Sequence, residues 1–124
     1  MGEFDKKINS YIAGFVQKFL PRHEEIIHSG LFVLSSKQKD LNIFDWYYNG
    51  YSVISETISS YLRLMCYNRI VEFTNDGLYS LVKNQTSVQN EDLAQAIKNI
   101  EDTLVKYGSG FDIIREAKKI FSSS

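Results

Sequence analysis

The chain has 124 residues, of which 44% are hydrophobic and 23% are charged. This length suits one domain around a single core, and the composition excludes a disordered or fibrous protein. Fourteen basic residues against fifteen acidic ones give a formal net charge of −1, which excludes a bulk electrostatic attraction to nucleic acid or to an anionic membrane.

Cysteine content and hydropathy restrict the cellular setting. The single cysteine, Cys66, excludes an internal disulfide and a cysteine-based zinc cluster. The first residues lack the basic-then-apolar order of a signal peptide, and no apolar run approaches the roughly eighteen residues of a membrane span. We therefore expect a protein of the cytoplasm or nucleoid that is not secreted and has no membrane partner.

The first 36 residues predict two helices. Apolar residues recur every three or four positions from Phe4 to Phe19, which places them on one face of a helix over residues 1–20. Pro21 ends that helix and suits the first turn of a second one over residues 22–36, where Glu24 and Glu25 favour its positive end. Apolar residues nearly encircle the second helix, so we expect it deep in the core.

An aromatic segment and a third long helix follow. Residues 35–40 are a polar connection, and residues 41–48 predict a short aromatic helix stopped by Asn49-Gly50. Ser52 or Ser55 then caps a helix with an apolar stripe from Ile54 to Met65. Its opposite face is rich in hydroxyl groups, which can hydrogen-bond the bases or phosphates of DNA.

Residues 70–82 predict a β-hairpin. Two short apolar runs, 70–73 and 78–82, flank the turn Thr74-Asn75-Asp76-Gly77, whose residue types are typical of hairpin turns. An irregular loop in a purely helical bundle is the alternative for this segment.

The order of a short helix, a longer helix and a tight hairpin over residues 22–83 resembles the winged helix-turn-helix superfamily of DNA-binding proteins. The resemblance implies a mainly α fold with a small β-hairpin, in which the longer helix enters the major groove and the hairpin forms the wing. Arg69 stands where that family commonly has a glycine, so we expect Asn68 to take the left-handed conformation at the helix end. The resemblance matches Ser55, Thr57, Ser59, Ser60 and Arg63 to groove-facing positions and Asn75 to the wing tip. If the protein binds DNA in this way, we expect Arg63, Lys37, Lys39 and Lys83 to hold phosphates.

The C-terminal segment, residues 90–121, predicts further helices. Asn90, Glu91 and Asp92 suit a helix start, and the Gly108-Ser109-Gly110 segment interrupts the apolar pattern before a last short helix. The helix that begins at residue 90 packs with the apolar face of the N-terminal helix in one of two ways. The two faces either complete the core of one chain or form the interface of a homodimer that reads paired half-sites. The residues expected at such an interface are Phe4, Ile8, Ile12, Phe15, Phe19, Leu93, Ile97, Ile100, Leu104 and Tyr107.

No enzyme is predicted, because the sequence shows no paired carboxylates with a pocket, no nucleophile with a base and no phosphate-binding glycine loop. His23 and His28 are spaced so that they lie on different sides of a helix, which disfavours a metal site, and no cofactor is expected. The leading hypothesis is a sequence-specific double-stranded DNA-binding protein, namely a dimeric transcriptional regulator or a replication or partition factor. The alternative is a protein-interaction module that docks through Trp46, Tyr47 and Tyr48. It is favoured because residues 37–83 contain five basic and five acidic residues and so carry no excess positive charge for DNA.

Overall fold

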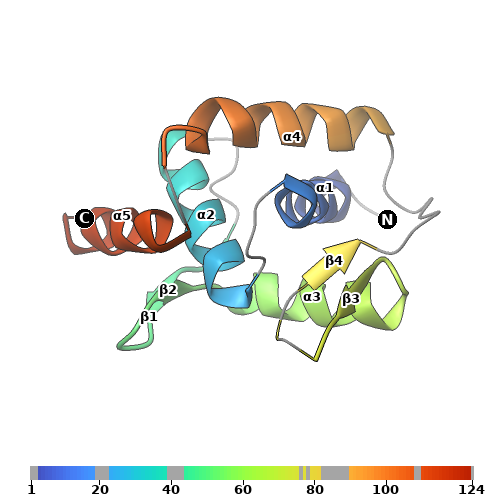
Figure 1. Cartoon of the computed structure of the whole chain (residues 1–124), viewed down its shortest axis with the longest axis horizontal. Helices are drawn as coiled ribbons and strands as arrows, with labels where there is room; N and C mark the ends of the chain where they lie inside the picture. Colours follow the sequence, from blue (N-terminus) through green and yellow to red (C-terminus); the bar gives the residue numbers. More distant parts are fainter. Residues whose placement is uncertain are drawn as a thin grey trace.

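A computed structural model of the chain describes residues 3–18, 23–38, 44–75, 77, 79–81, 90–107 and 110–123. Within those ranges the protein is mainly helical, with two separate two-stranded antiparallel hairpins (Figure 1). The elements in chain order are α1 (Glu3–Lys18), α2 (Glu24–Lys37), β1 (Tyr47–Tyr48), β2 (Val53–Ile54), α3 (Glu56–Tyr67), β3 (Val71–Phe73), β4 (Tyr79–Leu81), α4 (Asn90–Leu104) and α5 (Gly110–Ser123).

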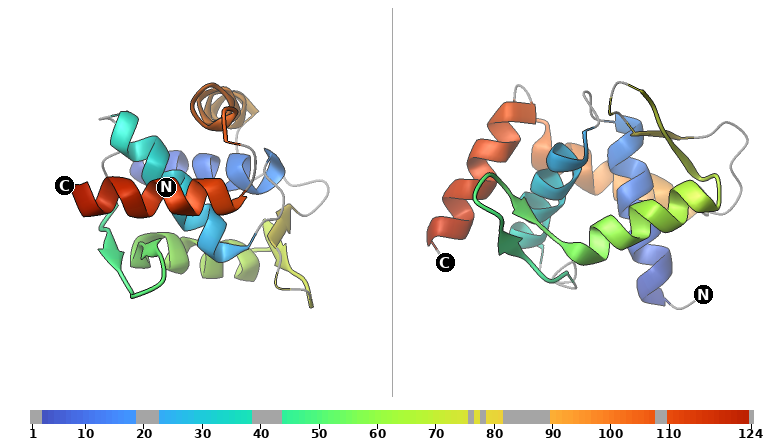
Figure 2. Two further views of the ribbon diagram at one scale, coloured as in Figure 1. Left: turned by 60° about the vertical axis from the view of Figure 1, so that its left-hand side comes forward. Right: turned by 90° about the horizontal axis from the view of Figure 1, so that it is seen from below.

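The helices pack in pairs around α1 and α2. Helix α1 lies between α4 on one side and α3 with β4 on the other, and α5 packs along α2 (Figures 1 and 2). The buried side chains form one cluster to which all five helices contribute. As the sequence predicts, α2 lies deep in the core, since every residue from Ile26 to Ser35 is buried.

The crossing of α1 and α2 depends on Gly30. A Cβ atom at this position would lie 2.1 Å from a ring carbon of Phe15, closer than non-bonded carbons can approach. Gly110, the first residue of α5, is similarly close to Ile26. The absence of a side chain at these two positions lets α1 and α5 reach α2.

The prediction of a helix over residues 41–48 is wrong for residues 44–48, the part of this range that the structure describes. Residues 44–46 are not helical, and Tyr47 and Tyr48 pair with Ile54 and Val53 in a hairpin. The side-chain oxygen of Asn49 accepts hydrogen bonds at 2.9 Å from the backbone N–H groups of Tyr51 and Ser52, and Gly50 has a φ of +98°. Asn-Gly here forms the hairpin turn rather than a helix stop.

Helix α3 ends in a Schellman motif. The N–H of Ile70 donates to the carbonyl of Met65 at 2.7 Å, and the N–H of Arg69 donates to the carbonyl of Cys66 at 3.1 Å. The residue in the left-handed conformation is Arg69, with φ of 62°, whereas Asn68 has φ of −85°. The expectation for Asn68 is therefore wrong, because the motif needs its left-handed residue one position later.

The residues expected at a dimer interface pack inside one chain. Gly14 of α1 lies against Ala96, Ile97 and Ile100 of α4, and the amide of Asn99 donates a hydrogen bond to the Tyr11 hydroxyl. Five of the predicted interface side chains are buried within the chain, and three are partly buried. The buried ones are Ile8, Ile12, Phe15, Ile100 and Leu104, the partly buried ones are Leu93, Ile97 and Tyr107, and the side chain of Phe4 and residue Phe19 lie outside the described part.

Candidate interaction surface

A buried histidine joins α2 to the start of α3. His28 is 1% exposed, and its Nδ1 accepts a hydrogen bond of 3.0 Å from the backbone N–H of Ser55, the residue before α3. In the neutral imidazole the proton must then be on Nε2, which donates to Oε2 of Glu24 at 3.0 Å. The ring therefore connects the N-terminus of α3 to the first turn of α2.

Glu24 extends this network to the second hairpin. Its carboxylate accepts hydrogen bonds from the Ser59 hydroxyl at 2.8 Å and from the Tyr79 hydroxyl at 3.1 Å. The bond from His28, helped by those from Ser59 and Tyr79, outweighs partial burial and lowers the pKa of Glu24 to about 2. Burial, followed by the negative charge of Glu24, raises the pKa of Tyr79 well above its ordinary value. One carboxylate thus ties together α2, α3 and β4.

Asp45 holds the first turn of α3 from the other side. Its Oδ1 accepts hydrogen bonds from the hydroxyls of Thr57 at 2.8 Å and Ser55 at 2.9 Å, and these bonds lower its pKa. A carboxylate at this end also suits the helix dipole. Together, Asp45, Glu24 and His28 fix the position of α3 on the core.

This polar network lacks the geometry of a nucleophile with a base. The Ser59 hydroxyl lies 3.3 Å from Nε2 of His28, but it donates to Glu24, and Nε2 carries the proton that also points to Glu24. The remaining nitrogen of the ring is occupied by the Ser55 N–H. His28 therefore has no free lone pair to accept a proton from Ser59, and the arrangement stabilises the fold without activating a hydroxyl.

The structure separates the residues expected to contact DNA. Ser55 is fully buried, so its assignment to a groove-facing position is wrong. Thr57 and Ser59 are partly buried and donate to Asp45 and Glu24, because carboxylates from the preceding segments lie within reach of these hydroxyls. The exposed ones are Ser60, Arg63, Lys37 and Asn75, whereas Lys39 and Lys83 lie outside the described residues.

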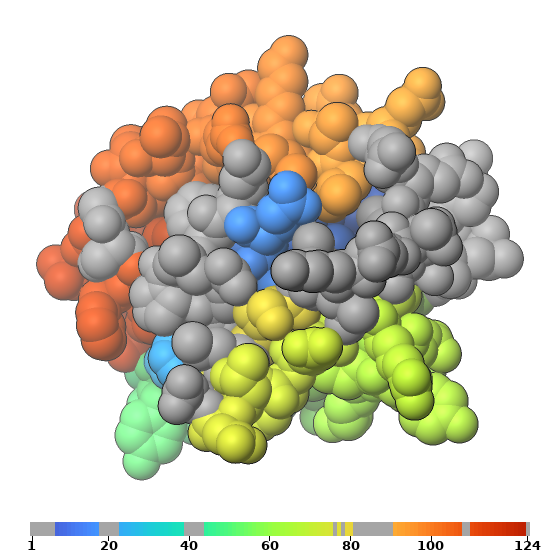
Figure 3. All heavy atoms as spheres, turned by 45° about the vertical axis from the view of Figure 1, so that its right-hand side comes forward, coloured from blue at the N-terminus to red at the C-terminus, as the bar shows by residue number. Residues whose placement is uncertain are grey.

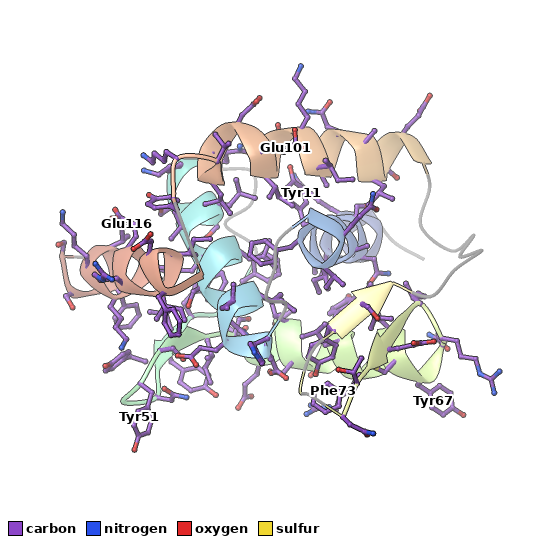
Figure 4. The ribbon with its side chains drawn as sticks, in the orientation of Figure 1. Tyr11, Tyr51, Tyr67, Phe73, Glu101 and Glu116 are labelled. Carbon is purple, nitrogen blue, oxygen red and sulfur yellow. The ribbon has the colours of Figure 1, made fainter. Side chains whose placement is uncertain are left out.

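Large apolar side chains occupy the exposed part of α3 and β3 instead. Leu64 is 54% exposed, Tyr67 is 85% exposed and Phe73 is 61% exposed. Tyr67 and Phe73 project from the same end of the molecule (Figure 4), where the last turn of α3 and the β3–β4 hairpin lie side by side (Figure 3). We call Leu64, Tyr67 and Phe73, with the backbone that carries them, the α3–β3 surface.

A hollow of about 560 Å³, open to solvent, lies beside Phe73, the one residue of the α3–β3 surface among its described lining residues. It is lined by Cys66 and Arg69 at the end of α3 and by the three residues of β3. Burial, followed by the negative charge of Glu24, raises the pKa of the Cys66 thiol, which keeps the thiol protonated and apolar. The hollow is therefore suited to contact rather than to chemistry at sulfur.

The aromatic residues before α3 divide between packing and exposure. Trp46 is partly buried and packs edge-on against Phe32 with ring centroids 5.1 Å apart, and its buried Nε1 has no hydrogen-bond partner among the described residues. Tyr48 lies beside Phe121 of α5, but it remains exposed, as do Tyr47 and Tyr51. Trp46 is thus mainly a packing residue, while the tyrosines of the β1–β2 hairpin reach the surface.

Sequence reasoning missed the α3–β3 surface. Leu64 and Tyr67 are three residues apart and lie off the buried stripe of Ile58, Leu62 and Met65, so helical spacing alone places them on the outside. The hydroxyl groups on the outer side of the same helix give a competing, polar signal. Phe73 gives a weaker signal, because either face of a short strand can be buried.

Within the described ranges, no three His, Cys, Asp or Glu side chains gather in an arrangement that could hold a metal ion. None of the helices there has the length and apolar character needed to cross a bilayer. In comparisons with known proteins, no family model, curated protein or solved structure matches this chain.

Proposed function

We propose that this protein is an interaction module that binds another protein through the α3–β3 surface. The observation that carries the proposal is the exposure of Leu64 and Tyr67 on α3 and of Phe73 on β3, two elements that contact each other. Exposed apolar side chains that gather in one place mark interaction sites, and aromatic residues with nearby arginine are enriched at protein interfaces. Arg63 within α3 and Arg69, two residues after its last residue, are also exposed.

The charges of this region favour a protein partner over DNA. The exposed charged residues of α3, of its end and of β3 are balanced, with Glu56 and Glu72 against Arg63 and Arg69. DNA binding depends on cationic contacts with phosphates, which release counterions, and carboxylates on the contact face oppose this. The hydroxyls of Thr57 and Ser59 are also bonded to Asp45 and Glu24.

Alanine substitutions of the surface residues test the proposal. The full chain, carrying an affinity tag, is used to capture proteins from an extract of its native cells, with quantification by mass spectrometry. For any partner that binds through this surface, the captured amount is expected to fall at least about tenfold with Tyr67→Ala or Phe73→Ala, since interface aromatics are frequent hot spots. Phe111→Ala and Val105→Ala are matched controls, because those side chains are 74% and 75% exposed on the α4–α5 corner. Equal losses of captured partner in the surface variants and in the control variants would reject the α3–β3 surface as the binding site.

A second candidate function is DNA binding by a winged helix-turn-helix. The order α2, α3 and then the β3–β4 hairpin resembles that fold, and Arg63, Ser60 and Asn75 are exposed on α3 and the hairpin turn. A labelled random-sequence duplex at low ionic strength tests it by fluorescence anisotropy. On a palindromic duplex that the protein binds, Arg63→Ala is expected to weaken binding by about 1–3 kcal/mol if Arg63 reads a base. The absence of salt-dependent binding rejects this candidate.

A further inference from the structure

We propose that the partner contacts the α3–β3 surface as an extended segment that adds a third strand to the free edge of β3. This inference rests on the proposed function and names the kind of partner. In the part of the chain that the structure describes, β3 pairs only with β4 in a two-stranded sheet. Its other edge therefore offers main-chain N–H and C=O groups that a second extended chain can pair with.

The hollow beside β3 lies along this edge. Side chains of successive strand residues point to opposite faces, yet Val71, Glu72 and Phe73 all line the same hollow. A space that meets all three residues runs along the edge of the strand rather than over one face. The end of α3, through Cys66 and Arg69, forms its opposite wall. The hollow can therefore take an extended backbone between α3 and β3.

The charge of Glu72, on the strand itself, selects the residue directly opposite it, whereas Arg69, the other charged residue among the described lining of the hollow, lies across from the strand at the end of α3. Glu72 is exposed, and within the described residues its carboxylate has no hydrogen bond or ion pair. A lysine or arginine opposite Glu72 on the added strand would pair with it, because cross-strand neighbours on one face interact. The residues on either side of that lysine fall on the face of Val71 and Phe73. Phe73 packs on Tyr79 with ring centroids 5.0 Å apart and leaves 61% of its side chain exposed, so these positions favour apolar residues.

The same charge disfavours a second copy of this chain as the occupant. Two β3 strands paired antiparallel about their middle residue would place Glu72 opposite its own copy. Like charges at directly opposed positions destabilise a strand pair. The occupant is therefore a segment of another protein with a basic residue flanked by apolar ones.

Three fluorescein-labelled peptides with alternating valine and threonine test the inference against the full chain. The first has a central lysine, the second a central glutamate, and the third a central lysine flanked by prolines, which cannot pair as a strand. Affinities are measured by fluorescence polarisation, and the contact residues by amide chemical shifts. The lysine peptide is expected to change the amide chemical shifts of residues 71–73. The glutamate peptide is expected to bind about three- to fivefold more weakly, as one cross-strand charge pair predicts. The proline peptide is expected not to bind.

Charge reversal at position 72 is the matched variant. Glu72 is exposed and unpaired within the described residues, so Glu72→Lys is expected to fold normally and to reverse the preference between the lysine and glutamate peptides. Binding of the proline peptide with the same affinity, an unchanged preference in Glu72→Lys, or no binding of any peptide at about 1 mM overturns the inference. The proposed function is judged separately, because capture that depends on Leu64 and Tyr67 involves side chains outside β3.

Discussion

The Nδ1 atom of His28 accepts a hydrogen bond of 3.0 Å from the backbone N–H of Ser55, across 27 residues of sequence. This bond places the start of α3 on α2, and the Nε2 side of the same ring contacts Glu24, which holds α3 again through Ser59. This buried imidazole, together with Glu24 and Asp45, therefore holds α3 in the orientation that exposes Leu64 and Tyr67.

Removal of this imidazole is expected to destabilise the protein. His28→Ala leaves the Ser55 N–H without its acceptor in a buried place, and we expect a loss of about 2–3 kcal/mol in the free energy of unfolding. Urea denaturation followed by circular dichroism measures it. His23→Ala is the control, because His23 is exposed and its hydrogen bond to the carbonyl of Gly77 is at the surface. Equal effects of the two substitutions would contradict the role given to His28.

Acid is expected to weaken the network at Glu24. Its pKa is about 2 in the folded protein and 4.5 for an unperturbed glutamate, so its contribution to stability is complete above about pH 4.5 and is lost as the pH falls toward 2. The side chain is 43% exposed, so after allowance for solvent screening we expect about 1–2 kcal/mol. Denaturation midpoints between about pH 2 and pH 7 measure it.

Glu24→Gln keeps the size of the side chain and removes its titration. Its stability is expected to fall less than that of the unmodified protein between pH 4.5 and pH 2. A parallel pH dependence of the two proteins would show that other carboxylates cause the acid sensitivity.

A glycine at position 69 is expected to stabilise the protein. Arg69 has a positive φ of 62°, which costs a residue with a side chain about 1–2 kcal/mol relative to glycine. Arg69→Gly is therefore expected to raise the free energy of unfolding by about 1 kcal/mol, with part of the gain offset by the greater freedom of glycine in the unfolded chain. Thermal unfolding measures the change. Arg69→Ala controls for the loss of the side chain, and an equal gain in that variant would contradict the strain.

The close contact between Gly30 and Phe15 predicts that a side chain at position 30 lowers the stability of the fold and that a smaller side chain at position 15 restores part of it. A Cβ atom at position 30 would lie 2.1 Å from the Phe15 ring, so Gly30→Ala is expected to cost about 1–3 kcal/mol through overpacking. Phe15→Leu provides space and should recover part of this loss in the double variant. Denaturant unfolding of the four proteins of the cycle measures the coupling, and strictly additive effects would contradict the contact.

Much of the fold follows from the sequence, because helical spacing is a strong local signal. The apolar stripe that runs from Phe4 and the one that runs from Leu93 predict α1 and α4, and the Asn-Asp-Gly sequence predicts the β3–β4 hairpin. The same patterns do not show which stripes face one another, so a seam between α1 and α4 of one chain was indistinguishable from a seam between two chains. The Asn49-Gly50 pair was ambiguous for a similar reason, since it can end a helix or turn a hairpin.

The candidate site was less accessible to sequence reasoning. The hydroxyls of Ser55 and Ser59 suggested a polar outer face, but their acceptors, Asp45 and Glu24, come from segments 10 and 35 residues away. Only the tertiary arrangement shows that these hydroxyls point to neighbouring carboxylates. With them accounted for, the exposed apolar residues Leu64 and Tyr67 become the main feature of α3.

Site-specific photo-crosslinking tests the central claim, that the α3–β3 surface binds a protein partner, most directly. A photoreactive phenylalanine analogue is placed at position 67 and, in a separate protein, at position 111, where Phe111 is similarly exposed on the α4–α5 corner. Both proteins are irradiated in native cells, and the products are identified by mass spectrometry. The account predicts one dominant protein adduct from position 67 that is missing from position 111. The same adducts from both positions, or adducts from position 111 alone, would contradict it.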